Sequence, residues 1–145
     1  MTRYIIKGGK PLKGAVRIGG AKNSSFKLMI ASLLAQGESR LLDISRIGDV
    51  EVTRQVIETL GGTVKSRGKG AIFINPDKLK SCRIPRDFGY KSRASIMFAG
   101  PLLSRCGQAF LPLPGGDQIG RRPVDRHLEG LQALGAKIKH LNGFI

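Results

Sequence analysis

The chain has 145 residues, of which 25 are Lys or Arg and 10 are Asp or Glu, so its formal charge is +15. This length allows one domain with a hydrophobic core, and no apolar run approaches the roughly 18 residues that cross a bilayer, so we expect a soluble, cytoplasmic protein that has no membrane as a partner. The charge attracts anionic partners, but the absence of Trp and of basic runs interleaved with aromatic residues argues against nucleic acid as the partner.

The N-terminal run MTRYIIKGGKPLKG is interrupted by glycine, proline and lysine too early for a secretory signal.

The first predicted element after this run is a helix. The run NSSFKLMIASLLAQG then offers a polar N-cap, followed by apolar residues at helical spacing that include Phe26, Met29, Ile30 and Leu33. Residues 39–44 after this helix predict a short strand.

A second helix and a hairpin follow. The run DVEVTRQVIETLGG has apolar residues at helical spacing and ends in Leu60-Gly61, and glycine after a last helical turn can take the left-handed conformation that closes a helix. The run TVKSRGKGAIFI predicts two strands that fold back around its glycines.

The second half of the chain resembles the first. IETLGGTVKSRG, residues 57–68, aligns with LQALGAKIKHLNG, residues 131–143, and SLLAQGES, residues 32–39, aligns with PLLSRCGQA, residues 101–109. Two matches in the same order predict a repeat of about seventy residues. Each copy is predicted to be a βαβαββ unit, which gives an α/β fold class.

The second copy carries about four extra residues in the run LPLPGGDQIGRRP, just before the predicted helix VDRHLEGLQALG. Pro123 suits the first turn of that helix. The free N–H groups of a helix start, together with Arg121 and Arg122, predict an anion site there. Asp117 in the same loop is either a salt-bridge partner of these arginines or a proton carrier, and the sequence does not choose between the two.

Two further basic stretches, GGAKN at residues 19–23 and KSRAS at residues 91–95, lie at corresponding helix starts of the two copies. Each alone is more often a solvated cap than a binding site. We expect no metal and no cofactor, because the two cysteines and two histidines lack the spacing of metal ligands. The two cysteines, Cys82 and Cys106, are expected to be reduced and structural, and the two histidines are His127 and His140.

Three ordered stretches, GGAKNSS, SRASIMFAGPLLSR and PLPGGDQIGRRPVDRHLEGLQALGA, closely resemble the UDP-N-acetylglucosamine 1-carboxyvinyltransferase family of enolpyruvyl transferases. The resemblance implies an inverse α/β barrel lobe built from βαβαββ units, here incomplete. It also implies transfer of the enolpyruvyl group of phosphoenolpyruvate to the 3'-hydroxyl of UDP-N-acetylglucosamine, which opens peptidoglycan synthesis. A sister enzyme that acts on shikimate 3-phosphate has a PGDKS-like motif near its start, so GGAKN favours the sugar enzyme.

The resemblance also implies roles for individual residues. Lys22 and Arg122 would engage phosphoenolpyruvate, Asn23 would hold the sugar nucleotide, and Arg93 would bind an anionic substrate group. The residues expected to line the uridine pocket are Pro123, Val124, Asp125 and Arg126. Asp117 lies where most relatives carry a proton-donating cysteine, the group that fosfomycin alkylates, so the resemblance implies a proton donor that this drug does not attack.

A complete member of that family is close to three times as long as this chain. The resemblance implies that residues 1–20 pair into a second lobe, that residues 21–145 form part of the first lobe with repeats at roughly 21–75 and 90–145, and that the isolated chain is inactive. The missing C-terminal lobe of the same protein is then a partner. Two alternatives stay open: a basic binding module for nucleic acid or nucleotide, and a shikimate-type enzyme.

Overall fold

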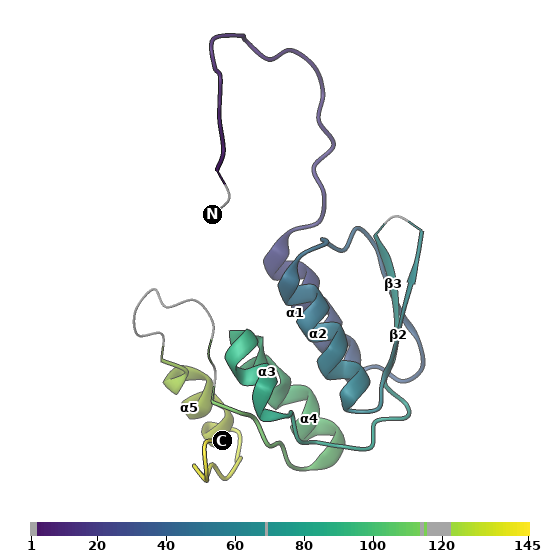
Figure 1. Cartoon of the computed structure of the whole chain (residues 1–145). Helices are drawn as coiled ribbons and strands as arrows, with labels where there is room; N and C mark the ends of the chain where they lie inside the picture. The colour runs from purple at the N-terminus through teal and green to yellow at the C-terminus, as the bar shows by residue number, and fades with distance from the viewer. Residues whose placement is uncertain (1–2, 69, 114, 116–122) are drawn as a thin grey trace.

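The computed structural model describes residues 3–68, 70–113, 115 and 123–145. Its elements in chain order are α1 (Lys22–Ala31), η1 (Ser32–Leu34), β1 (Ser39–Leu41), α2 (Gly48–Thr59), β2 (Thr63–Arg67), β3 (Ala71–Asn75), α3 (Arg86–Lys91), η2 (Arg93–Phe98), α4 (Ala99–Cys106) and α5 (Asp125–Ala133), where η marks a 3-10 helix. Helices α1 and α2 lie between the sheet and the remaining helices, with α5 farthest from the sheet (Figure 1).

The sheet has three antiparallel strands in the order β1-β3-β2. Ile72 and Ile74 of β3 are buried, and Phe73 between them points to the opposite face, as the two-residue period of a strand requires. The register places Phe73 between Arg40 of β1 and Lys65 of β2. One face of the sheet is therefore apolar and covered by helices, whereas the outer face is basic.

The hydrophobic core joins the two copies of the repeat. Met29 of α1 and Ile57 of α2 have no exposed surface, and Leu102 of α4 is equally buried. Phe98, at the end of η2, belongs to the same cluster and is 1% exposed. Burying a side chain of this size stabilises a fold by about 1.5–3 kcal/mol, so the first helix of the second copy is held firmly against the first copy.

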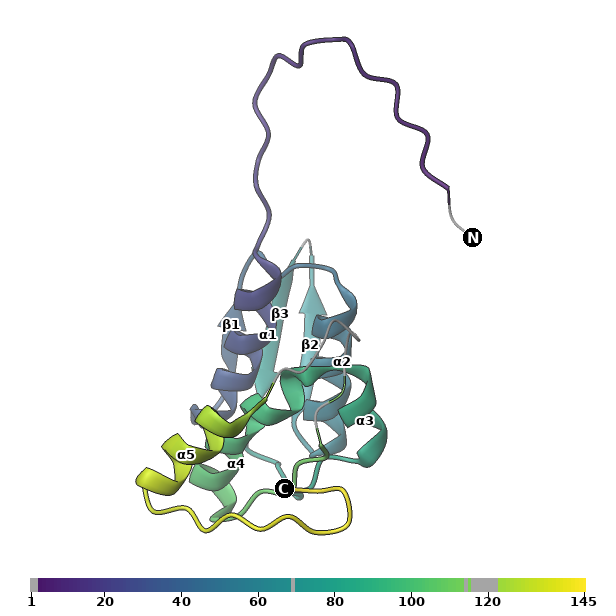
Figure 2. The same ribbon diagram turned by 90° about the vertical axis from the view of Figure 1, so that its left-hand side faces the viewer.

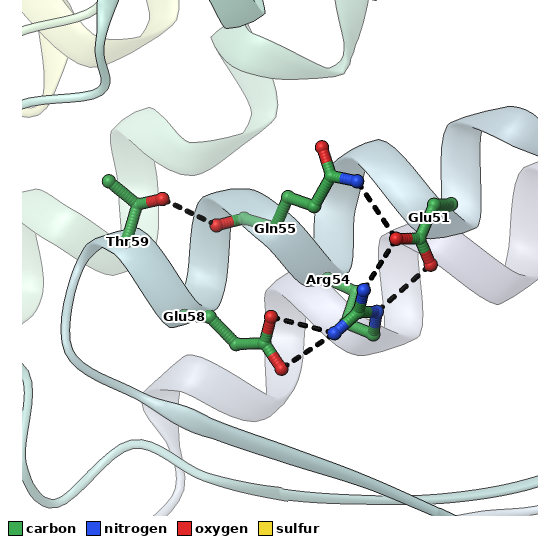
Figure 3. Close-up of polar contacts among 5 residues, drawn as sticks. All are labelled: Glu51, Arg54, Gln55, Glu58 and Thr59. Atoms are coloured by element: carbon green, nitrogen blue, oxygen red, sulfur yellow. Dashed lines mark hydrogen bonds and ion pairs between the residues drawn. The ribbon is translucent and has the colours of Figure 1, made fainter.

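The outer face of α2 carries a network of charged and polar side chains (Figure 3). The Arg54 guanidinium lies between two carboxylates, with Nε 2.9 Å from Glu51 and Nη1 2.7 Å from Glu58. Gln55 also donates to Glu51, and Thr59 donates to the Gln55 carbonyl. Hydrogen bonds from Arg54 and then Gln55 lower the pKa of Glu51 to about 2. Because the network is exposed, its contribution to stability is small.

The second copy pairs its backbone at the place that β1 and β3 occupy in the first copy. Leu111 and Ile145 exchange two hydrogen bonds of 2.9 and 2.8 Å. In the described residues beyond α5, Leu141 and Phe144 form an isolated antiparallel bridge rather than a pair of strands. The reason is a tight turn at Asn142, whose φ is 48°, which closes Leu141 directly on Phe144.

Residues 3–20 form an extended segment that leaves the body of the molecule at the start of α1 (Figures 1 and 2). Its large apolar side chains are almost fully exposed, as shown by Ile6 at 89% and Leu12 at 98%. A run of apolar side chains this open is typical of a segment with a docking partner. None of the described helices has the length and apolar character needed to cross a membrane.

Candidate functional site

The start of α1 is pressed against the loop that precedes α2. A Cβ atom added to Gly20 would lie 1.6 Å from the carbonyl oxygen of Asp43, so only glycine fits this contact. The buried Ser25 hydroxyl donates to the Ala21 carbonyl at 2.8 Å and accepts from the backbone N–H of Ser45 at 3.0 Å. These contacts fix the direction in which the GGAKN stretch enters the helix.

The next contact joins α1 to α2 and η2. Lys22 Nζ lies 2.7 Å from Asp49 Oδ2, and Ser92 Oγ donates to Asp49 Oδ1 at 2.8 Å. Ser92 Oγ also accepts from the backbone N–H of Ala94 at 3.1 Å. The hydrogen bond from Lys22, supported by the one from Ser92, lowers the pKa of Asp49 although partial burial opposes the shift. Asp49 is therefore a carboxylate at neutral pH that connects three helix starts.

Arg93 follows Ser92 directly and reaches the start of α5. Its Nη2 lies 3.5 Å from the carbonyl oxygen of Pro123. Val124, at the N-terminal boundary of α5, is half-buried and accepts from the His127 N–H at 2.9 Å, which begins the helix. The structure thus brings Lys22, Arg93 and the start of α5 together through a continuous set of contacts.

The other residues predicted for the site have different positions. Asn23 is exposed in the first turn of α1, and Asp125 and Arg126 are exposed in the first turn of α5. Three further predicted residues lie outside the described residues: Asp117, Arg121 and Arg122. Two cations on neighbouring elements, with further N–H groups at the helix starts, form an arrangement that suits a phosphate or carboxylate group.

Sequence reasoning missed Asp49 and Ser92. An acid in the first turn of a helix ordinarily interacts with the helix dipole, so no local pattern distinguished Asp49 from such an acid. Ser92 lies within the KSRAS stretch, but its partner is 43 positions away along the chain. The paired placement of GGAKN and KSRAS at equivalent helix starts was the available signal.

The described residues contain no group of three His, Cys, Asp or Glu side chains placed to hold a metal ion. Cys82 and Cys106 are both free thiols and both partly buried. Burial, together with the neighbouring Cys82 thiol, raises the pKa of Cys106, so Cys106 is a neutral thiol at neutral pH.

The fold is that of enolpyruvyl transferases. The enolpyruvyl transferase NikO from Streptomyces tendae matches with a TM-score of 0.63 and 25% identity, over 72% of this chain and 24% of that chain. EPSP synthase from Acinetobacter baumannii matches with a TM-score of 0.66 and 20% identity, over 93% of this chain and 31% of that chain. The predicted fold class is confirmed.

The family model of EPSP synthase (3-phosphoshikimate 1-carboxyvinyltransferase) matches residues 6–145, and the chain belongs to this family. The chain is 43% identical over 145 residues to UDP-N-acetylglucosamine 1-carboxyvinyltransferase 3 of Caldanaerobacter subterraneus. It is 46% identical over 145 residues to UDP-N-acetylglucosamine 1-carboxyvinyltransferase of Gluconobacter oxydans. Both matches cover 100% of this chain and 34% of the relative, so the chain spans about a third of their length.

Proposed function

We propose that this chain is the first third of an enolpyruvyl transferase that uses phosphoenolpyruvate and UDP-N-acetylglucosamine, in the first step of peptidoglycan synthesis. The 3'-hydroxyl oxygen bonds to C2 of phosphoenolpyruvate, the C2–O bond to phosphate breaks, and the hydroxyl proton leaves with phosphate. The observation that carries this proposal is the 43–46% identity, along the whole chain, to relatives that bear this enzyme name. The enzyme names of these relatives, together with the GGAKN stretch, favour UDP-N-acetylglucosamine over shikimate 3-phosphate as the acceptor.

Lys22 and Arg93 are the described side chains proposed to meet the anionic groups of the substrates. The Lys22 side chain is 57% exposed, and its ammonium forms an ion pair with Asp49 at 2.7 Å. Arg122 would add a second contact to phosphoenolpyruvate, and Asn23 would contact the sugar nucleotide. The residues proposed to line the uridine pocket are Pro123, Val124, Asp125 and Arg126.

Asp117 is proposed to be the general acid that protonates the methylene carbon of phosphoenolpyruvate. The methyl group so formed loses one proton as phosphate leaves, which restores the double bond. A free aspartate has a pKa of about 3.9 and is a poor donor at neutral pH. Nearby phosphate and carboxylate charges, and the exclusion of water when the site closes, would raise that pKa toward the working range.

A carboxylate at position 117 has a further consequence for the epoxide drug fosfomycin. A carboxylate is a much weaker nucleophile toward an epoxide than a cysteine thiolate. The enzyme that contains Asp117 is therefore expected to keep its activity in fosfomycin, and the Asp117→Cys variant is expected to lose it with a covalent adduct visible by intact mass. An adduct on the aspartate form, or full activity of Asp117→Ala, would refute the role of Asp117.

The exposed segment at residues 3–20 supports a proposal about the missing partner. We propose that it docks on the second lobe of the complete protein, where Ile6 and Leu12 would be covered. Without that lobe the site has no closing wall to position the substrates and exclude water. The isolated chain is therefore expected to release no phosphate from phosphoenolpyruvate.

A chimeric enzyme tests the proposed function. The chain replaces the aligned first third of the Caldanaerobacter relative, and release of phosphate from phosphoenolpyruvate is measured with and without UDP-N-acetylglucosamine. We expect turnover that depends on the sugar nucleotide and that falls at least a hundredfold in Lys22→Ala. A folded chimera that binds both substrates without turnover would contradict the proposal.

The outer face of the sheet favours a second candidate function, the binding of single-stranded nucleic acid. The guanidinium carbons of Arg40 and Arg67 lie 5.8 and 5.1 Å from the centre of the Phe73 ring, and Lys65 is beside the same ring in register. Among the described residues none of these three cations has a carboxylate within 4.0 Å. Binding of a random oligonucleotide that falls steeply with salt, and is lost when the three are changed to Gln, would support this candidate over the enzyme.

A further inference from the structure

Ser92 occupies a central position in the contacts between the two copies of the repeat. The residue is only 4% exposed and lies directly before Arg93. Its hydroxyl group donates to Asp49 Oδ1 at 2.8 Å and accepts from the Ala94 N–H at 3.1 Å. A serine hydroxyl has one proton to donate, and Asp49 receives it.

The geometry of Asp49 shows why the donor matters. Its two oxygens are divided, with Oδ2 bound to Lys22 and Oδ1 bound to Ser92. The Asp49 side chain is 26% exposed, and that of Lys22 is 57% exposed. An ion pair this open, on its own, holds two side chains only weakly in one geometry. The buried hydroxyl of Ser92 fixes the rotation of the carboxylate from the inner side.

We propose that Ser92 is a positioning residue that, through Asp49, aims Lys22 at the space beside Arg93. This inference rests on the proposed function, because it assigns Lys22 and Arg93 to the binding of one anionic substrate. With the hydroxyl in place, both cations are oriented before the anion arrives, so binding requires less ordering of side chains. Without it, Asp49 Oδ1 loses the hydrogen bond from its inner side, and the ion pair with Lys22 is fixed less firmly.

A purely structural role for Ser92 has a different consequence. In that case the hydroxyl only caps η2 through the Ala94 N–H, and its loss affects stability but not Lys22. Ser92→Ala removes both contacts, whereas Ser92→Thr keeps a hydroxyl that can make both. Ser32→Ala is a matched control, because Ser32 is also buried and its hydroxyl donates only to Met29 of the adjoining helix.

The test uses the whole chain with isotope-labelled Lys and Asp side chains and inorganic phosphate as the probe. We expect Ser92→Ala to weaken the phosphate affinity seen at Lys22 at least threefold and to move the Asp49 carboxyl resonance. Ser92→Thr is expected to restore both, and Ser32→Ala to change neither. Each variant is first shown to be folded by its amide spectrum.

An Asp49 resonance and phosphate affinity that are the same in Ser92→Ala and the parent chain would overturn the inference. Equal losses in Ser92→Ala and Ser32→Ala would also overturn it, because they would indicate a general effect on stability. Neither result depends on turnover. Failure of the chimeric enzyme to transfer the enolpyruvyl group is therefore a separate result, which bears on the proposed function.

Discussion

The replacement of Gly20 by alanine tests the contact that sets the start of α1. The added Cβ would lie 1.6 Å from the Asp43 carbonyl oxygen, and real Cβ atoms essentially never approach closer than 3.0 Å, so the two backbones must separate by about 1.4 Å. The contacting oxygen of Asp43 is a backbone atom, so the clash cannot be relieved by rotation of a side chain. Overpacking of this kind costs about 1–3 kcal/mol of the free energy of unfolding. A shift of this size also exceeds the tolerance of the 2.7 Å contact between Lys22 and Asp49.

Urea denaturation followed by circular dichroism measures the loss, and Gly19→Ala is the matched control. A Cβ atom at Gly19 would meet nothing within 4 Å, so that variant is expected to stay within about 0.5 kcal/mol of the parent chain. In thermal denaturation, each kcal/mol corresponds to roughly 2–4 °C in Tm for a chain of this size. Equal stabilities of Gly20→Ala and Gly19→Ala would refute the reasoning.

Three further predictions concern stability and charge. Ser95→Ala is expected to raise the free energy of unfolding by up to about 1 kcal/mol, because Ser95 Oγ is buried without a hydrogen-bond partner among the described residues; a loss in urea denaturation would contradict this. Leu102→Ala is expected to cost about 2–5 kcal/mol in the same assay, because this core side chain is fully buried, and a loss below 1 kcal/mol would show that the core does not hold α4. Arg54→Ala is expected to raise the pKa of Glu51 from about 2 toward its usual 4.5, as followed by NMR titration. Since a lowered pKa stabilises the fold above the unfolded value and this gain is lost as pH falls from about 4.5 to 2, the variant should show less acid-dependent loss there; an unchanged Glu51 pKa would refute the link.

The first copy of the repeat could be predicted from the sequence because its signals are local. The apolar spacing of α1 and α2 and the glycines of the hairpin each act within a few residues, and these elements are confirmed. The Leu-Gly helix end is also observed, since Gly61 has a φ of 102° directly after the last turn. The predicted strand at residues 39–44 is shorter and ends at Leu41, because Asp43 has a φ of 53°, which interrupts the extended backbone conformation.

The remaining features depend on contacts between distant parts of the chain. The link from Asp49 to Ser92 joins residues 43 positions apart, and no local pattern marks either partner. The pairing of Leu111 with Ile145 is likewise set by how the second copy closes, not by the β-propensity of either run. The docking of residues 3–20 on a second lobe and the roles of the site residues remain predictions.

Product identification under competition shows which acceptor the enzyme uses. The chimeric enzyme is offered phosphoenolpyruvate with equal concentrations of UDP-N-acetylglucosamine and shikimate 3-phosphate, and the products are resolved by mass spectrometry. We expect the carboxyvinyl group to appear on the sugar nucleotide and this product to disappear in Lys22→Ala. A carboxyvinyl group on shikimate 3-phosphate, or on neither acceptor in a folded chimera, would contradict it.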